Sequence, residues 1–192
     1  MSARLVLLGP PGAGKGTQAV RLAARLAVPA ISTGDIFRTN VSEGTDLGRL
    51  AQEYMNSGAL VPDEVTNAMV RNRLASGDAV NGFLLDGYPR NVAQAGELDD
   101  MLNATGVALN AVVEFTADID EVVTRLLRRA EIEGRADDTE SVIRHRMTVY
   151  DEQTAPLTAL YQLRGILVQV DGMGGVDAVT DRLVGALDAR IR

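Results

Sequence analysis

The sequence of 192 residues contains no cysteine and no tryptophan, only one lysine and only one histidine. Without cysteine the chain can form neither a disulfide bond nor a thiolate metal site, which is typical of proteins in a reducing compartment. Aromatic residues make up only 4% of the chain, so its core must consist mainly of leucine, valine, alanine and isoleucine. Hydrophobic residues still make up 46%, enough for the core of one ordinary globular domain.

Two further absences concern location and partners. No apolar run approaches the roughly 20 residues that a membrane-spanning helix needs, and the N-terminus lacks the pattern of a secretory signal. The net charge of −7 argues against a general basic surface for nucleic acid or for anionic membranes. We therefore expect a cytoplasmic protein that binds neither nucleic acid nor membranes, and in which any basic cluster is local.

The single lysine, Lys15, lies in the segment Gly9-Pro10-Pro11-Gly12-Ala13-Gly14-Lys15-Gly16-Thr17. This segment fits the phosphate-loop pattern G-x-x-x-x-G-K followed by a hydroxyl residue, although Gly16 displaces the hydroxyl to Thr17. An apolar run, Leu5 to Leu8, precedes it, and a helical pattern, Gln18 to Ala27, follows it, as such a loop requires. Glycines let backbone N–H groups converge on an anion, and a lysine ammonium can insert between phosphate oxygens. The context favours a phosphate site over a plain turn.

Short β-like runs alternate with helical stretches along the chain. This alternation predicts an α/β fold with a parallel five-stranded sheet that helices cover on both faces. The longest stretch without a strand pattern, Thr33 to Ser76, predicts a helical excursion inserted between two core strands, and a shorter charged interruption spans Arg128 to Asp138. The predicted strands are Arg4–Leu8, Val28–Ile31, Gly82–Asp86, Ala111–Phe115 and Gly165–Val170.

Ligands of such sheets bind beyond the carboxyl ends of the strands, where Asp86 ends an apolar run. A Walker-B element has this form and holds Mg²⁺ directly or through water, although an aspartate here could also cap the next element. Beside a phosphate loop we favour the magnesium role for Asp86, and Thr17 is a second candidate ligand.

Two more groups of polar residues follow predicted strands. A helix beginning near Asn91 would let the guanidinium of Arg90 and the amide of Gln94 address one ligand, the alternative being a turn with a solvated arginine. After the second strand, Thr33 could face a ligand or cap the next helix, and Arg38 could be a surface residue.

Six arginines lie close together near the second interruption. Charge runs are usually solvated faces, but in an acidic protein such a cluster suits bidentate binding of phosphate oxygens. We favour ligand binding for Arg129, Arg135 and Arg146, and we interpret His145 as a solvated residue. The six are Arg125, Arg128, Arg129, Arg135, Arg144 and Arg146.

Several segments, in this order along nearly the whole chain, resemble those of the adenylate kinases: GPPGAGKGT, STGDIFR, GALVP, LLDGYPRNVAQA, GRADD and TAPL. The resemblance implies a three-layer P-loop NTPase fold, a monomer, and reversible Mg²⁺-dependent phosphoryl transfer from ATP to AMP giving two ADP. It implies a core of residues 1–31, 62–127 and 139–192, an AMP-binding lobe of residues 32–61, and a lid of residues 128–138. The long family form carries a β-rich insert in this lid, sometimes with a cysteine zinc site. Here only five residues separate Arg129 from Arg135, so we expect the short-lid form and no zinc.

The resemblance also implies roles for the residues at matching positions. Lys15 would contact the transferring phosphoryl group, Arg125 and Arg129 would face ATP, Gly174 would approach its adenine, and Arg135 and Arg146 would bridge the phosphates. The ATP phosphates would be cradled by Gly12, Ala13, Gly14, Lys15, Gly16 and Thr17. AMP would be held by Thr33, Arg38, Ala59, Leu60, Val61, Gly87, Tyr88, Pro89, Arg90 and Gln94.

Two alternatives remain at this point. Relatives that prefer UMP or CMP resemble this chain but carry alanine in place of Thr33 and asparagine in place of Gln94, so both positions favour AMP. The other alternative is a nucleotide-binding switch without turnover. A second phosphate site with Arg38 and Arg90, far in sequence from the phosphate loop, argues against it because a switch needs only one nucleotide.

Overall fold

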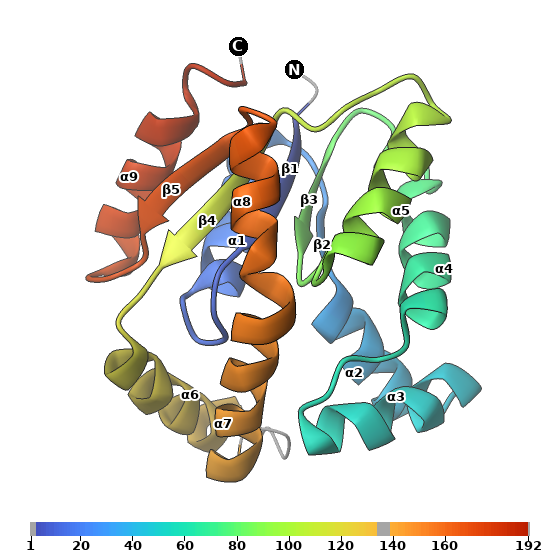
Figure 1. Ribbon diagram of the computed structural model, residues 1–192, viewed down its shortest axis with the longest axis vertical. Helices are drawn as coiled ribbons and strands as arrows, with labels where there is room; N and C mark the ends of the chain where they lie inside the picture. Colours follow the sequence, from blue (N-terminus) through green and yellow to red (C-terminus); the bar gives the residue numbers. More distant parts are fainter. Residues whose placement is uncertain (1–2, 134–138, 192) are drawn as a thin grey trace.

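The computed structural model describes residues 3–133 and 139–191. Five parallel strands form one sheet in the order β2-β3-β1-β4-β5, with helices on both faces (Figure 1). The predicted three-layer α/β fold is therefore confirmed. The strands are β1 (Arg4–Leu8), β2 (Ala30–Ser32), β3 (Phe83–Asp86), β4 (Ala111–Thr116) and β5 (Leu167–Asp171).

Three strands begin later than the sequence pattern predicted, and the third does so by only one residue, at Phe83 rather than at Gly82. The second strand begins at Ala30 rather than at Val28, since Pro29 has no N–H group to offer a neighbouring strand. The fifth begins at Leu167 rather than at Gly165, which has a φ of 70° and belongs to the turn after the preceding helix.

Helices account for most of the remaining chain. The helices are α1 (Lys15–Leu26), α2 (Thr33–Glu43), α3 (Asp46–Ser57), α4 (Asp63–Leu74), α5 (Val92–Asn103), α6 (Ile119–Glu133), α7 (Glu140–Val149), α8 (Pro156–Leu163) and α9 (Val176–Leu187), with a π-helix, η1 (Tyr150–Thr154), between α7 and α8. None of the helices in the described ranges has the length and apolar character that crossing a membrane requires.

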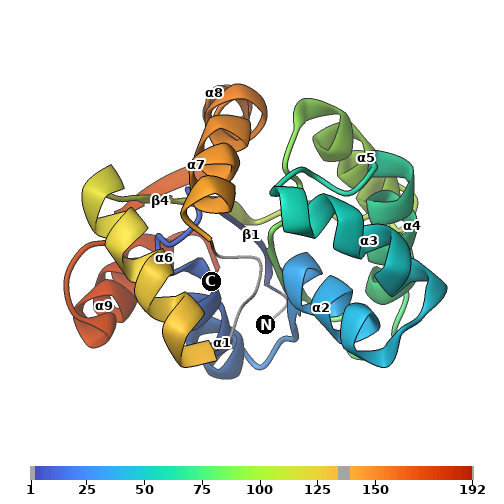
Figure 2. The same ribbon diagram turned by 90° about the horizontal axis from the view of Figure 1, so that it is seen from below.

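The central strand β1 explains why the sheet has a helix layer on each face. Its side chains alternate, so Leu5 and Leu7 pack with α1 and α9, whereas Val6 and Leu8 pack with the layer that contains α5 and α8. Seen from the carboxyl ends of the strands, the two layers lie on opposite sides of the sheet (Figure 2). Burial on both faces accounts for the apolar run from Leu5 to Leu8 in this strand.

Two helical units extend beyond the carboxyl ends of the strands (Figures 1 and 2). On one side, α2 and α3 pack around a small core of their own that contains Phe37, Ala51 and Val61. On the other side, α6 and α7 pack around Val122, Leu126 and Ile143. These two units therefore flank the edge of the sheet at which ligands of such folds bind.

Candidate active site

The phosphate loop connects β1 to α1 in a conformation that depends on glycine. Gly14 precedes the helix with a φ of 89°, and α1 begins at Lys15, three residues before the predicted Gln18. Gly12 has a φ of 82°, and a Cβ atom there would lie 2.9 Å from the Leu126 side chain. The loop thus packs closely on α6. Because α1 begins within the loop, the positive end of the helix dipole points at the space that the loop encloses.

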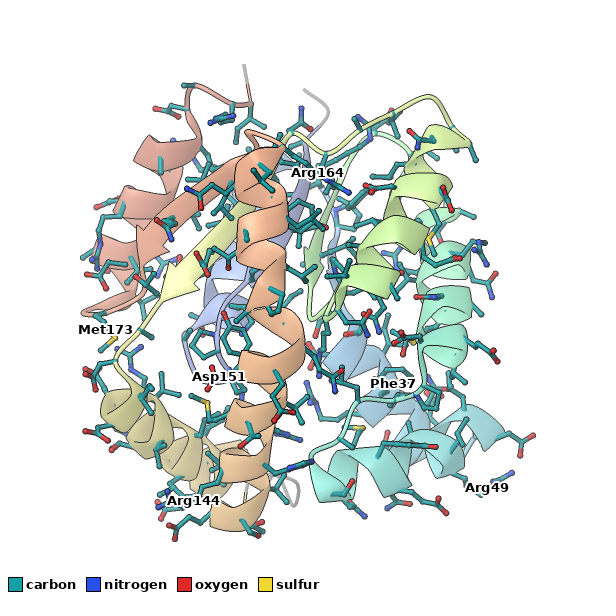
Figure 3. The ribbon with its side chains drawn as sticks, in the orientation of Figure 1. Phe37, Arg49, Arg144, Asp151, Arg164 and Met173 are labelled. Atoms are coloured by element: carbon teal, nitrogen blue, oxygen red, sulfur yellow. The ribbon has the colours of Figure 1, made fainter. Side chains whose placement is uncertain are left out.

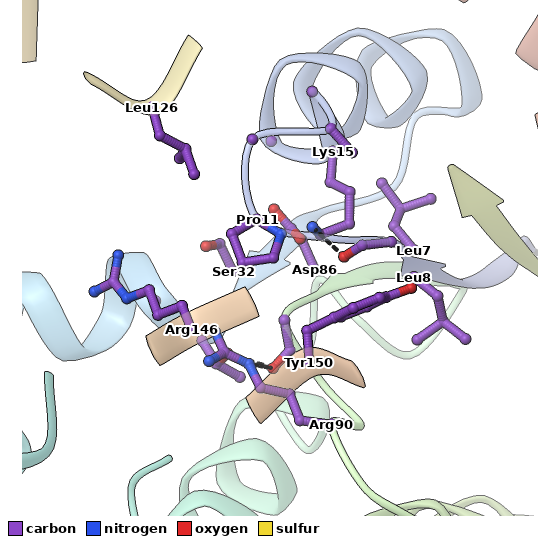
Figure 4. Close-up of a pocket in the computed structure, with 18 of the residues that line it drawn as sticks. Leu7, Leu8, Pro11, Lys15, Ser32, Asp86, Arg90, Leu126, Arg146 and Tyr150 are labelled. Carbon is purple, nitrogen blue, oxygen red and sulfur yellow. Dashed lines mark hydrogen bonds between the residues drawn. The ribbon is translucent and has the colours of Figure 1, made fainter. Parts of the chain in front are cut away.

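Lys15 turns its ammonium back toward the loop. Its Nζ donates to the carbonyl oxygens of Gly9, at 2.7 Å, and Pro10, at 2.8 Å. Figure 4 shows the ammonium turned this way. Burial lowers the pKa of Lys15 from 10.5 to about 8, with Asp86 opposing the change and Arg90 and Arg129 adding to it. An ammonium has three N–H donors, so one remains for an anionic ligand, whose charge would raise this pKa again.

Asp86 ends β3 beside the phosphate loop. Strands β1 and β3 are neighbours with Leu7 opposite Asp86, and a Cβ atom on Gly16 would lie 3.5 Å from Asp86 Oδ2. Among the described residues, no group of three or more histidine, aspartate or glutamate side chains is placed to hold a metal ion. Mg²⁺ usually binds one or two carboxylates together with phosphates and water, so a single carboxylate facing a phosphate loop fits its chemistry.

A second group of polar side chains surrounds the carbonyl oxygen of Gly87. The buried hydroxyl of Thr33 donates to this oxygen at 2.9 Å, and Arg90 Nε donates to it at 2.9 Å. The possibility that Thr33 caps α2 was wrong, because the side chain of Ser32 accepts from the Asp35 N–H in that role. The second strand ends at Ser32, which leaves Thr33 inside the helix and turned toward β3.

Gln94 is 1% exposed and lies in the first turn of α5, near the predicted start of that helix. Its Oε1 accepts from the backbone N–H of Arg90 at 2.8 Å, and its Nε2 donates to Asp63 Oδ1 at 2.7 Å. The amide that the sequence placed near Arg90 is therefore fixed in position.

Positive charge gathers around Arg90. Burial lowers the pKa of Arg90 from its usual value, Arg146 and Arg38 lower it further, and Asp86 opposes them. Figure 4 shows Lys15, Asp86, Arg90 and Arg146 at the same cavity although they come from different elements. Cations held this close favour an anionic ligand that lies between them.

The arginines of α6 and α7 have different surroundings. Arg125 donates to the Gly172 carbonyl at 3.2 Å and pairs with Glu121 on its own helix. Arg144 pairs with Glu140 on the outer surface of α7 (Figure 3), and His145 is exposed as expected. The expectation for Arg135 lies outside the described residues.

One cavity of about 720 Å³ brings these groups together at the carboxyl end of the sheet. Tyr88 does not line it, because its side chain lies in the core and its hydroxyl donates to Asn67 Oδ1 at 2.8 Å. Burial raises the pKa of this hydroxyl, which keeps it protonated. The predicted residues that line the cavity are Gly12, Ala13, Gly14, Lys15, Gly16, Thr17, Thr33, Arg38, Ala59, Leu60, Val61, Asp86, Gly87, Pro89, Arg90, Gln94, Arg125, Arg129, Arg146 and Gly174.

The π-helix η1 contributes two cavity residues that the sequence analysis did not assign, Tyr150 and Thr154. Thr154 Oγ1 donates to the carbonyl oxygen of Arg90 at 2.7 Å, and burial raises the pKa of Tyr150 to about 12. Nothing in the local pattern distinguishes this turn from the α-helices on either side. Only the position of Thr154 just before Pro156, which begins α8, marks a change in the helix.

Comparisons with known proteins agree with this geometry. Residues 7–166 match the family model for adenylate kinase. The chain is 62% identical over 185 residues to an adenylate kinase of Kocuria rhizophila. The aligned residues cover 96% of this chain and 98% of the relative. It is also 62% identical to one from a Nocardioides species, over 96% and 97% of the two chains, and 59% identical to one from Thermobifida fusca, over 97% and 99%. As the motifs predicted, the chain belongs to the adenylate kinase family.

Proposed function

We propose that this chain catalyses reversible phosphoryl transfer from Mg·ATP to AMP, giving two ADP. One observation carries the proposal: two groups of residues suited to binding phosphate line one cavity. The first is the phosphate loop with Lys15, between β1 and α1. The second is Arg38 from α2 together with Arg90 from the β3–α5 connection. Nucleotides bound at the two groups would turn their phosphates toward each other, which direct transfer requires.

On the donor side, the backbone from Gly12 to Thr17 binds the ATP phosphates and Lys15 contacts the phosphoryl group in transfer. The position of the loop at the N-terminus of α1 supports this assignment. Arg129, Arg135 and Arg146 neutralise the triphosphate, while Arg125 and the backbone of Gly174 lie at its adenine.

On the acceptor side, Arg38 and Arg90 bind the AMP phosphate. Thr33 and Gln94 lie at the base, and the backbones of Ala59 to Val61 and of Gly87 to Pro89 line its binding site. The support is that all these residues except Tyr88 line the same cavity. Tyr88 acts from the core, where its hydroxyl oxygen also lies 3.2 Å from the backbone carbonyl oxygen of Gln94.

Asp86 and Thr17 are the residues that would hold Mg²⁺, Asp86 through water. When bound, the ion would neutralise phosphate charge and fix the geometry of the triphosphate. The location of Asp86 beside Gly16 supports this assignment.

The chemical step needs no covalent bond to the protein. An oxygen of the AMP phosphate attacks the γ-phosphorus, the bond to the β–γ bridging oxygen breaks, and that oxygen leaves with the electron pair as part of ADP. Lys15, Arg90, Arg129, Arg135 and Arg146 balance the charge on the oxygens of the transferring group. The chain therefore contributes alignment, charge and exclusion of water.

The division into core (1–31, 62–127 and 139–192), AMP-binding lobe (32–61) and short lid (128–138) is part of this proposal. The separate small core between α2 and α3 supports the lobe. Because α6 continues to Glu133, the first half of the lid segment is helical. Closure of the cavity over ATP then depends on the arginines more than on a covering loop.

The test is ADP formation from Mg·ATP with AMP, UMP, CMP and GMP as acceptors. We expect AMP to be the preferred acceptor by a wide margin. Preference for UMP or CMP would show that the acceptor is a pyrimidine nucleotide. Nucleotide binding without turnover on any acceptor would show that the protein is a nucleotide-binding switch and not a kinase.

A further inference from the structure

The amide of Gln94 forms hydrogen bonds with two groups, one of which can only donate and the other only accept. Its Oε1 accepts from the Arg90 backbone N–H, which can only donate, and its Nε2 donates to Asp63, whose carboxylate can only accept. A rotated amide would place oxygen against oxygen and nitrogen against nitrogen. At 1% exposure Gln94 has almost no access to water that could compensate, so one orientation is strongly favoured.

Asp63 provides the side-chain half of this constraint. It is the first residue of α4, and its carboxylate also accepts from Asn91 Nδ2, at 3.0 Å and 3.1 Å. Asn91 in turn caps α5 by accepting from the Gln94 N–H at 2.8 Å. Asp63 thus joins the start of α4 to the start of α5. It is not among the residues that line the cavity, whereas Gln94, to which it is hydrogen-bonded, is one of them.

The two fixed contacts leave the amide one acceptor position and one N–H donor for a ligand. A 6-aminopurine presents an N–H₂ donor at C6 and an acceptor at N1. The N–H₂ group would donate to Oε1 of the amide, and N1 would accept from Nε2. A 6-oxopurine presents an acceptor at C6 and an N–H donor at N1. These groups could pair with the amide only if it were rotated, so that Oε1 and Nε2 exchanged places. The orientation of the amide therefore decides between the two kinds of purine.

We propose that Asp63 is a positioning residue for base choice, which fixes the Gln94 amide so that the acceptor site takes AMP and rejects IMP and GMP. This inference rests on the proposed function, because it requires the base of AMP to lie at Gln94. A simpler role for Asp63 would be that of an acid in the first turn of a helix, favoured there by the helix dipole. Glu64 lies in the same turn, is exposed, and offers a matched control for that role.

The experiment compares kcat/KM for AMP and for IMP at saturating Mg·ATP. IMP is the better probe because it differs from AMP only at the edge in question. In Asp63→Asn the new amide can donate or accept, so it no longer opposes rotation of the Gln94 amide, and only the Arg90 N–H still favours the original orientation. We expect the AMP-to-IMP ratio to fall by about tenfold or more, the size of one hydrogen bond. Glu64→Gln should leave the ratio within about twofold, since surface changes are usually small, and KM for Mg·ATP should stay the same in both variants.

A double-mutant cycle separates positioning from a general structural effect. In the Gln94→Ala background, Asp63→Asn should no longer change the AMP-to-IMP ratio. Asp63→Ser is the second variant if the first folds poorly, because serine also begins helices and its hydroxyl can both donate and accept. The inference is overturned if the ratio is unchanged in Asp63→Asn, or if it changes equally with and without Gln94. A wild-type protein that makes no ADP from AMP would instead overturn the proposed function itself.

Discussion

At the scale of single residues, the charge on Lys15 has opposite effects on stability and on activity. Burial lowers its pKa to about 8, so the folded protein without nucleotide holds the charged form at a cost, although that form still predominates below about pH 8. Because the folded pKa lies below the unfolded one, the charged form costs stability below about pH 8, and the cost disappears as the pH approaches about 10.5. Anionic phosphates would offset that cost when they bind.

We expect Lys15→Met to lower turnover by about a hundredfold or more, roughly 3 kcal/mol of transition-state stabilisation. Its thermal stability without nucleotide at pH 7 should equal or exceed that of the wild type, and the difference should vanish near pH 10. Arg21→Met, which removes an exposed charge from the same helix, is the control and should keep its activity. Steady-state ADP formation and thermal unfolding at both pH values measure these effects. Near-normal turnover in folded Lys15→Met would contradict the phosphate-loop assignment.

The same pKa predicts a pH dependence. Since kcat/KM reports the free enzyme, its value for Mg·ATP should fall above about pH 8, by up to about tenfold per pH unit. The kcat should stay constant to higher pH, because bound phosphates raise the pKa of the ammonium. Rates across pH 6.5 to 10 test this, and a kcat/KM that is flat throughout would show that Lys15 stays charged in the free enzyme.

At the scale of elements, the end of α1 has a residue poorly suited to its conformation. Ala27 has a φ of 54°, the only positive φ outside glycine in the described chain. We expect Ala27→Gly to stabilise the protein by about 1 kcal/mol, or about 2–4 °C in melting temperature. Ala24→Gly, at an exposed position inside the same helix, should destabilise it by about 1 kcal/mol. A melting temperature lowered equally by both would mean that the φ of Ala27 carries no strain.

The elements also show what the sequence could predict. The phosphate loop, β1 and β3 were found because each depends on residues adjacent in sequence: a glycine pattern or a run of buried side chains. Individual side-chain hydrogen bonds between segments distant in sequence were not found, although the proximity of Asp86 to the phosphate loop was. Thr154 reaches Arg90 across 64 residues, and Asp63 reaches Gln94 across 31. The core position of the Tyr88 side chain was not predicted for the same reason, since its contact with α4 holds it there.

At the scale of the whole molecule, the two flanking units approach each other beside the cavity. Helix α3 contacts α7, and a Cβ atom at Gly58, which ends α3, would lie 3.0 Å from the carbonyl oxygen of Val142. Since Gly58 and Arg146 both line the cavity and lie close together, the unit of α2 and α3 contacts α7 at the cavity. A ligand that spans the cavity would therefore touch both units and stabilise their packing together.

Two adenosines joined by five phosphates would be such a ligand. We expect it to raise the melting temperature far more than ATP or AMP at equal concentration, because linking the halves avoids the entropy cost of binding a second molecule. At a thousand times its Kd the stabilisation would be about 4 kcal/mol, or about 8–16 °C for a chain of this size. Two adenosines joined by only two phosphates carry the same bases on a linker too short to reach both sites, so this control should give no more than the shift of a single nucleotide. If the long and short compounds give equal shifts, the cavity holds one nucleotide at a time, and direct transfer between two bound nucleotides is wrong.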